Sequence, residues 1–289
     1  MHLEPEGAHA SSHATWTWEP DLLVSFVLAA GLYGVGWLRA PEGERSRLAS
    51  WRAWCYGIGL LALVVALLSP VAGLSHELLF MHMNQHMLIL LAAPLLLLGA
   101  PLAAMRWALP ESARLWLEGA FAPGQPLQRL FCFFTHPVVA GTLYLGSLGI
   151  WHLPAFYDAA LGSSYLHELE HLFFLGTSLL FWWTVVYAGG PRRRLGYGLG
   201  VLYLALPMLE GNAIGATLTF ASYPVYSAYS EGPGMWGLSA MQDQQLAGLI
   251  MWVPGSLLYV VPMLLFLVRL VQQEEREARE AEASTGADG

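Results

Sequence analysis

The sequence contains little charge, and it has no lysine. Only 12% of its 289 residues are charged, and all 13 basic residues are Arg. Soluble globular domains carry about 25% charged residues, so this chain lacks the polar covering of a water-exposed surface. A net charge of −8 also argues against nucleic-acid binding. With 56% hydrophobic residues and 12 each of Trp, Tyr and Phe, the composition is that of a polytopic membrane protein.

Cysteine is almost as scarce. Cys55 and Cys132 are the two cysteines of the chain, and they are too far apart for a CxxC motif. This excludes a disulfide scaffold and a two-cysteine metal clip, and we expect both thiols to be reduced. The sequence has no GxSxG motif, phosphate-binding loop or dinucleotide fingerprint. The first 20 residues lack a hydrophobic core segment, so we expect no cleavable signal peptide.

Long apolar runs are abundant. A helix needs about 20 mostly apolar residues to cross a bilayer. Seven runs approach or exceed this length: Leu22–Leu38, Ala53–Val71, Leu78–Ala100, Phe133–Leu153, His167–Ala188, Leu195–Leu218 and Ala247–Val271. The sequence therefore predicts an all-α fold with seven transmembrane helices over residues 21–271. An N-terminal tail (1–20) and a C-terminal tail (272–289) flank it, and the second has the composition of a short solvated helix.

The arginines set the orientation of this domain. In a seven-span arrangement every one falls on the same side: Arg39, Arg45, Arg47, Arg52, Arg106, Arg114, Arg129, Arg192, Arg193, Arg194, Arg269, Arg276 and Arg279. Short loops rich in basic residues stay in the cytoplasm. We therefore expect the N-terminus outside, the C-terminus inside, and the protein in the cytoplasmic membrane as a multi-pass protein.

The histidines gather on the opposite side. Of the seven His outside the N-terminal tail, only His136 falls on the cytoplasmic side, where a structural cap or a surface contact is expected. The other six converge on the outer face: His76, His82, His86, His152, His167 and His171. Asp243 belongs to the same outer layer. We interpret His2, His9 and His13 in the tail as incidental, with a loose metal-collecting arm as the alternative. Ionisable groups at membrane depth are costly, which indicates a functional site.

Two of the histidine groupings have helical spacing. His82 and His86, like His167 and His171, are four residues apart, so each pair projects from one face of its helix. Two such pairs at equal depth would supply four imidazoles to one metal site. Met81, Met83 and Met87 surround the first pair. Imidazole suits copper and zinc, whereas thioether selects Cu(I). The mixture predicts copper, as Cu(I), with zinc as the alternative and with His76, Met83 and Met87 as accessory groups.

A zinc metalloprotease is a competing interpretation. The segment from His167 to His171 matches both HExxH and HxxEH. In the first of these motifs Glu168 would be the general base acting on a zinc-bound water. This interpretation leaves His82, His86 and His152 unexplained.

Two further alternatives remain open. A haem protein needs two facing imidazoles, and the second His of each pair would then have no role. A copper permease needs polar groups that continue inward from the histidines, and Glu210 is the candidate for this role. Glu210 would otherwise make a hydrogen bond between helices. The aromatic segment from Tyr223 to Trp236 would be an interfacial loop, or a lid over the histidines.

Several stretches together resemble one family. They are Asn84-Gln85-His86-Met87, Ala93-Pro94-Leu95, Gly99-Ala100-Pro101, Trp151-His152-Leu153-Pro154, Tyr157-Asp158, His167-Glu168-Leu169-Glu170-His171, Trp182-Trp183, Asp243-Gln244-Gln245-Leu246-Ala247-Gly248 and Met251-Trp252. In this order they resemble the CtaG proteins, the assembly factors of caa-type cytochrome c oxidase. The resemblance spans about Leu78–Met263.

The resemblance implies a seven-helix membrane protein that is needed to form active oxidase and handles copper for its metal centres. It also implies that the HExxH match is coincidental. The polar residues that match the family's motifs are His86, His152, His167, His171 and Asp243, whereas His82 matches less securely.

We therefore expect a non-enzymatic copper-binding assembly factor whose partners are the lipid bilayer and an oxidase subunit with a copper centre. The expected ligands are His82, His86, His167 and His171, with His152 and Asp243 as further ligands or as groups that orient them.

Overall fold

The computed structural model describes residues 15–45, 48–187, 195–230 and 232–287, and every regular element in these ranges is helical. The all-α prediction is therefore confirmed. Some residues discussed above lie outside the described ranges: His2, His9, His13, Arg47, Arg192, Arg193 and Arg194.

Within the described ranges, six helices are long and apolar enough to cross a membrane. They are α2 (Pro20–Arg39), α4 (Ser50–Leu68), α6 (Leu79–Leu98), α12 (Ser164–Val186), α13 (Tyr197–Phe220) and α14 (Ala240–Ala287). A bent pair, α9 (Pro126–Phe134) and α10 (Pro137–Trp151), brings the number of spans to seven if it is counted as one. The seven predicted spans correspond to these six helices and the bent pair.

The fourth span differs most from the prediction. Residues Phe133–Leu153 were expected to form one helix, but the chain bends by 57° between α9 and α10. His136 takes an extended conformation (ψ 131°) just before Pro137, which occupies the first position of α10. Proline disfavours helical geometry in the preceding residue and lacks an N–H donor, so the helix breaks there. With 15 residues, α10 alone spans about 22 Å, less than the hydrocarbon core.

His136 does not cap the helix at this break. His136 occupies the N-cap position of α10, but it is exposed and its side chain makes no capping hydrogen bond. Of the two expected roles, only a surface position is compatible with this geometry.

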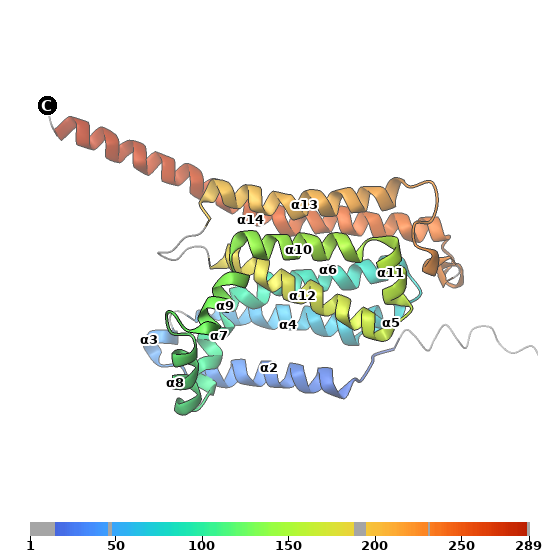
Figure 1. Cartoon of the computed structure of the whole chain (residues 1–289), viewed down its shortest axis with the longest axis horizontal. Coiled ribbons are helices and arrows are strands. Elements are labelled where there is room, and N and C mark those ends of the chain that lie inside the picture. The colour runs from blue at the N-terminus through green and yellow to red at the C-terminus, as the bar shows by residue number, and fades with distance from the viewer. Residues whose placement is uncertain (1–14, 46–47, 188–194, 231, 288–289) are drawn as a thin grey trace, which may run out of the picture.

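The last helix is longer than the predicted span. Residues Ala247–Val271 lie inside α14, which continues without a break to Ala287. The segment after Val271 is rich in Glu, Gln, Arg and Ala, which are strong helix formers. The expected tail helix is therefore an extension of the last span, and it projects from the bundle (Figure 1).

Helix α6 lies at the centre of the bundle. It packs against α4, α12 and α14, while α13 runs along α14 and α10 packs against α12 (Figure 1). Its apolar stretch is 56% buried, against 11% for the peripheral α2. Helices α13 and α14 approach closely because Gly215 and Gly248 face each other. A Cβ on Gly248 would lie 2.6 Å from the carbonyl oxygen of Gly215. Small residues allow such close packing in membranes.

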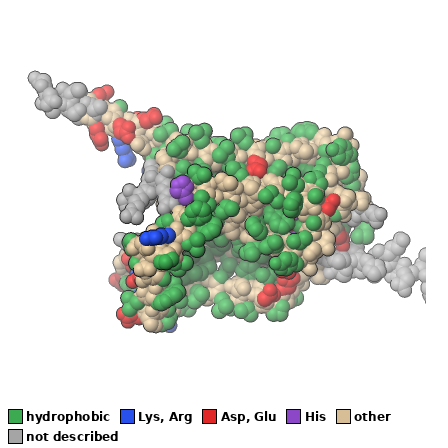
Figure 2. Space-filling model, viewed as in Figure 1, with side chains coloured by type: hydrophobic (Ala, Val, Ile, Leu, Met, Phe, Trp, Pro, Cys, Tyr) green, Lys and Arg blue, Asp and Glu red, His purple; other side chains and the backbone are tan. Residues whose placement is uncertain are grey.

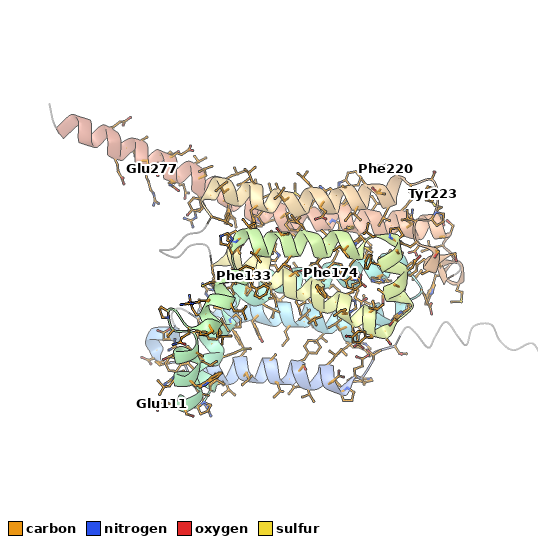
Figure 3. All side chains as sticks on the ribbon, in the orientation of Figure 1. Glu111, Phe133, Phe174, Phe220, Tyr223 and Glu277 are labelled. Atoms are coloured by element: carbon orange, nitrogen blue, oxygen red, sulfur yellow. The ribbon has the colours of Figure 1, made fainter. Side chains whose placement is uncertain are left out.

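The two ends of the bundle carry different groups. At one end lie α3 (Glu42–Arg45), α7 (Pro101–Met105), η1 (Arg106–Ala108), α8 (Glu111–Ala120) and α9 (Figure 1). These elements and the end of α2 carry Arg39, Arg106, Arg114 and Arg129. At the other end lie α5 (Pro70–Leu74), α11 (Pro154–Leu161), η2 (Ser227–Tyr229), η3 (Gly232–Trp236) and the start of α6. Between them, the visible surface is largely hydrophobic (Figure 2). Phe174 lies inside the bundle, whereas Phe220 lies on its outside (Figure 3).

Asp243 joins the last helix to the central one. Its side chain, on the first turn of α14, is fully buried and accepts hydrogen bonds from the backbone N–H groups of Leu79 (2.7 Å) and Phe80 (3.0 Å). These are unpaired donors in the first turn of α6, and the residue at the α6 N-cap, Leu78, offers no side-chain acceptor. A carboxylate at a helix N-terminus is also favoured by the helix dipole. Asp243 therefore fixes where α6 begins.

We expect Asp243→Asn to lower the thermal stability of the purified protein. The amide has one acceptor oxygen and no charge, so one N–H of α6 loses its partner, at a cost of about 1–3 kcal/mol. Thermal unfolding in detergent, followed by circular dichroism, measures the loss. Glu274→Gln, on the exposed part of the same helix, is the control and should unfold as the wild type does. Equal midpoints for both variants would contradict the capping role.

Candidate metal centre

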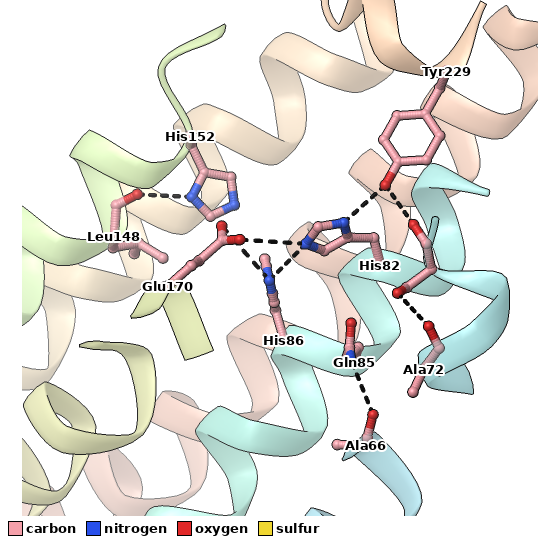
Figure 4. A network of polar contacts seen from close by, with 10 residues as sticks. Ala66, Ala72, His82, Gln85, His86, Leu148, His152, Glu170 and Tyr229 are labelled. Atoms are coloured by element: carbon pink, nitrogen blue, oxygen red, sulfur yellow. Dashed lines mark hydrogen bonds and ion pairs between the residues drawn. The ribbon is translucent and has the colours of Figure 1, made fainter. Parts of the chain in front are cut away.

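The first half of the site comes from α6. His82 and His86 are buried (0% and 1% exposed), and their Nε2 atoms lie 2.8 Å apart (Figure 4). Spacing of four residues on a helix puts both rings on one face, the face that α6 turns toward α12. Because α6 is the central helix, these imidazoles are removed from solvent on all sides.

The second half comes from α12. His167, Glu170 and His171 are three and four residues apart, so they share one face of this helix. Nitrogen atoms of His82, His167 and His171 lie within 4.8 Å of one another, and so do ligand atoms of His82, His86 and Glu170. His82 belongs to both groups. The structure thus brings the two predicted pairs into one cluster, which we name the His–Glu cluster: His82, His86, His167, Glu170 and His171.

Glu170 is the member that the sequence prediction did not identify. Its carboxylate is fully buried, and its oxygens lie 3.8 Å from His82 Nε2 and 3.7 Å from His86 Nε2. Glu168 was the acid of the competing metalloprotease interpretation, yet it is exposed and outside the cluster. The signal was present in the sequence, because Glu170 lies three residues after His167 and is the acid of the HxxEH pattern.

Hydrogen bonds fix the tautomer of His82. The Tyr229 hydroxyl donates its proton to the carbonyl of Ser75 (2.5 Å), so it can only accept from His82 Nδ1 at 2.8 Å (Figure 4). Burial raises the pKa of the Tyr229 phenol well above its usual value, which keeps this donor protonated. In a neutral ring the proton therefore sits on Nδ1, and the lone pair of Nε2 faces the cluster, where it accepts a hydrogen bond from His86 Nε2.

His152 has the same arrangement at the end of α10. Its Nδ1 lies 2.7 Å from the carbonyl oxygen of Leu148, which only accepts, so Nδ1 carries the proton. Its Nε2 is buried and has no hydrogen-bond partner among the described residues. The His152 ring lies 6.2 Å from that of His86. Histidines that bind metals characteristically donate the other ring N–H to a carbonyl or similar acceptor.

Several buried polar atoms of the site share this lack of partners. Within the described part of the chain, no hydrogen bond reaches His167 Nε2, His171 Nε2 or either oxygen of Glu170. Most buried polar atoms in proteins are paired, so a convergent set of unpaired ones needs an explanation such as an ion. Imidazole nitrogens with free lone pairs and a carboxylate are the donors that a transition metal binds.

The loop before α14 covers the cluster. Tyr226 donates a hydrogen bond to the carbonyl of His152 (3.0 Å) and stacks on Tyr157 with ring centroids 3.9 Å apart. Tyr157 in turn lies 5.1 Å from the ring of His82. Together with Tyr229, these contacts place the aromatic segment over the histidines, which is the lid position that the sequence suggested.

The remaining predicted site residues occupy other positions. His76 is exposed and makes an edge contact with His167, with ring centroids 5.0 Å apart, so it lies at the rim. Met83 is buried and Met87 is half-buried, each next to a histidine of the cluster on α6. Both oxygens of Asp243 bind the backbone of α6. Of its two expected roles, ligand or orienting group, the geometry favours the orienting role.

Comparisons with known proteins give sequence relatives. An uncharacterized protein of Mycobacterium bovis is 28% identical over 276 residues, which cover 91% of this chain and 40% of that protein. An uncharacterized protein of Mycobacterium leprae is 26% identical over 278 residues, with 90% and 40% coverage. The chain thus spans about two fifths of the length of these relatives. No solved structure matches the chain significantly.

A family model covers most of the chain. The model described as cytochrome c oxidase caa3 assembly factor (Caa3_CtaG) matches residues 31–273, a range that contains all five residues of the His–Glu cluster, together with His76, His152 and Asp243. This confirms the family resemblance found in the motifs. The chain belongs to the Caa3_CtaG family of cytochrome c oxidase caa3 assembly factors.

Proposed function

We propose that this protein binds copper at the His–Glu cluster and delivers it to a subunit of a caa3-type cytochrome c oxidase during assembly. One observation carries the proposal. Four imidazoles and a carboxylate from α6 and α12 meet in a buried site, and several of their donor atoms lack hydrogen-bond partners among the described residues.

A metal ion explains this arrangement better than hydrogen bonding alone. Removing a carboxylate from water costs several kcal/mol unless a positive charge compensates it. In the described structure, the groups nearest to Glu170 are neutral when their rings are unprotonated, and no Arg lies within ion-pair distance of it. A bound cation would supply the missing charge and would use the unpaired Nε2 atoms of His167 and His171.

Copper is favoured over zinc by the family. The chain belongs to a family of oxidase assembly factors, and an assembly factor that handles a metal would handle one that the oxidase contains. Imidazole binds both metals, so the ligand set supports copper without selecting it. We further propose that the arginine-bearing end faces the cytoplasm, which puts the cluster near the outer face of the cytoplasmic membrane. His76, exposed at the rim, lies where copper would enter or leave.

We expect purified wild-type protein to bind copper in the cluster and the His86→Ala/His171→Ala double variant to lose it, because each helix then keeps only one imidazole of its pair. Elemental analysis of copper per protein measures this directly. His136→Ala, at the opposite end of the bundle, is the control and should retain wild-type copper. The oxidase activity of membranes should fall in the double variant alone. A double variant with full copper content, or a wild type that binds none, would rule the proposal out.

The two glutamates of α12 provide a matched pair. Glu170→Gln removes the buried negative charge and should weaken copper binding by at least about 10-fold, as loss of groups next to a metal does. Glu168→Gln changes an exposed side chain on the same helix and should leave the affinity unchanged. Competition with a chromogenic copper chelator measures both. The metalloprotease interpretation predicts instead that Glu168→Gln abolishes peptide hydrolysis while zinc stays bound, and that result would replace copper delivery.

A further inference from the structure

A second group of metal-binding atoms lies deeper in the bundle. A small cavity of about 20 Å³ lies where α6, α13 and α14 meet, and three methionines line it, one from each helix: Met87, Met208 and Met251. Met87 directly follows His86 of the His–Glu cluster. Met251 lies eight residues after Asp243, about 12 Å further along α14. The cavity is therefore beyond the cluster, toward the middle of the membrane.

Small residues and proline create the space. Gly211 and Gly255 line the cavity, and the Sδ atom of Met87 lies 3.4 Å from the point where a Cβ on Gly255 would be. This distance places the Met87 sulfur at the cavity wall. Pro207 also lines the cavity, one residue before Met208 in α13. A cavity of this size holds about one atom or water molecule.

The polar groups of the wall are already engaged. Asn212 accepts a hydrogen bond from Ser256 through Oδ1 (2.8 Å), and the Tyr259 hydroxyl is 2.6 Å from the hydroxyl of Tyr144. The rest of the lining is aliphatic. The three thioethers are the soft donors that the wall offers to a ligand. Thioethers are soft ligands that select Cu(I) over harder cations.

We propose that Met87, Met208 and Met251 form a second copper site, a thioether site for Cu(I) separate from the His–Glu cluster. The proposal rests on the proposed copper-handling function and extends it. The cluster offers imidazoles and a carboxylate, whereas the thioether site binds only the reduced ion. Because Met87 and His86 are neighbours on α6, the two sites form consecutive positions for copper within the bundle.

A buried carboxylate, that of Glu210, lies near the cavity. Glu210 lies two residues after Met208 on α13, and its Oε2 is buried without a hydrogen-bond partner among the described residues. Its Oε1 lies 2.8 Å from the position of a Cβ on Gly149, so the carboxylate points toward α10 at the level of the cavity. It also interacts electrostatically with Tyr259, which lines the cavity. Glu210 does not line the cavity, so its carboxylate would reduce the cost of burying the cation through the field it contributes rather than as a ligand.

Anaerobic Cu(I) titration of the purified full-length protein against bicinchoninate tests the site. We expect the wild type to bind about two equivalents, one at the imidazoles and one at the thioethers. Met87→Leu/Met208→Leu/Met251→Leu, which conserves side-chain volume, should lose one equivalent. Met263→Leu, on α14 but away from the cavity, is the control and should bind as the wild type does. His86→Ala/His171→Ala should keep the thioether equivalent.

X-ray absorption at the copper edge identifies the ligands without depending on a variant. The His86→Ala/His171→Ala protein loaded with Cu(I) should show sulfur as the main scatterer, and the triple methionine variant should show only nitrogen and oxygen. If the wild type binds one equivalent without sulfur and the triple variant matches it, the thioether site is wrong while copper binding at the cluster stands. If the wild type binds no Cu(I), both proposals are wrong.

Discussion

The burial of Glu170 among histidines is the constraint on which the structure of this site depends. A carboxylate at membrane depth is expensive, and here it is fully buried next to His82 and His86. The surrounding elements hold it there. Asp243 fixes the start of α6, and Tyr229 and the carbonyl of Leu148 orient the rings of His82 and His152. A site held this firmly, with lone pairs facing inward, is organised before a cation arrives, which reduces the ordering cost of binding.

Much of this arrangement could be predicted from the sequence. Apolar runs of about 20 residues gave the spanning helices, and the one-sided arginines separated the two ends of the bundle. Spacing of four residues then placed His82 with His86 and His167 with His171. The histidine pairs could be predicted because helix periodicity is a local property, which depends only on residues a few positions apart. The helix-breaking effect of Pro137 is also local and can be read from the sequence. Its consequence, a span made of two short helices, depends on how α9 packs.

The remaining features depend on which helices are neighbours in the bundle. Short sequence motifs do not reveal these contacts. Glu168 and Glu170 are equivalent in a motif, and only the direction of α12 relative to α6 decides which one is buried. Asp243 was expected near the histidines, but its bonds to Leu79 and Phe80 arise from the contact of α14 with α6. The cavity lined by Met87, Met208 and Met251 brings together residues from three helices, and Met87 lies more than 120 positions before the other two in the chain. Such groupings appear only once the bundle is assembled.

The copper position in the loaded protein tests the central claim most directly. A structure of the copper-loaded protein, with anomalous scattering recorded on both sides of the copper edge, locates the ion independently of activity. The account predicts an anomalous peak bounded by His82, His86, His167, Glu170 and His171. Copper bound elsewhere, such as at His136 or the N-terminal histidines, with no peak in the His–Glu cluster, would contradict it.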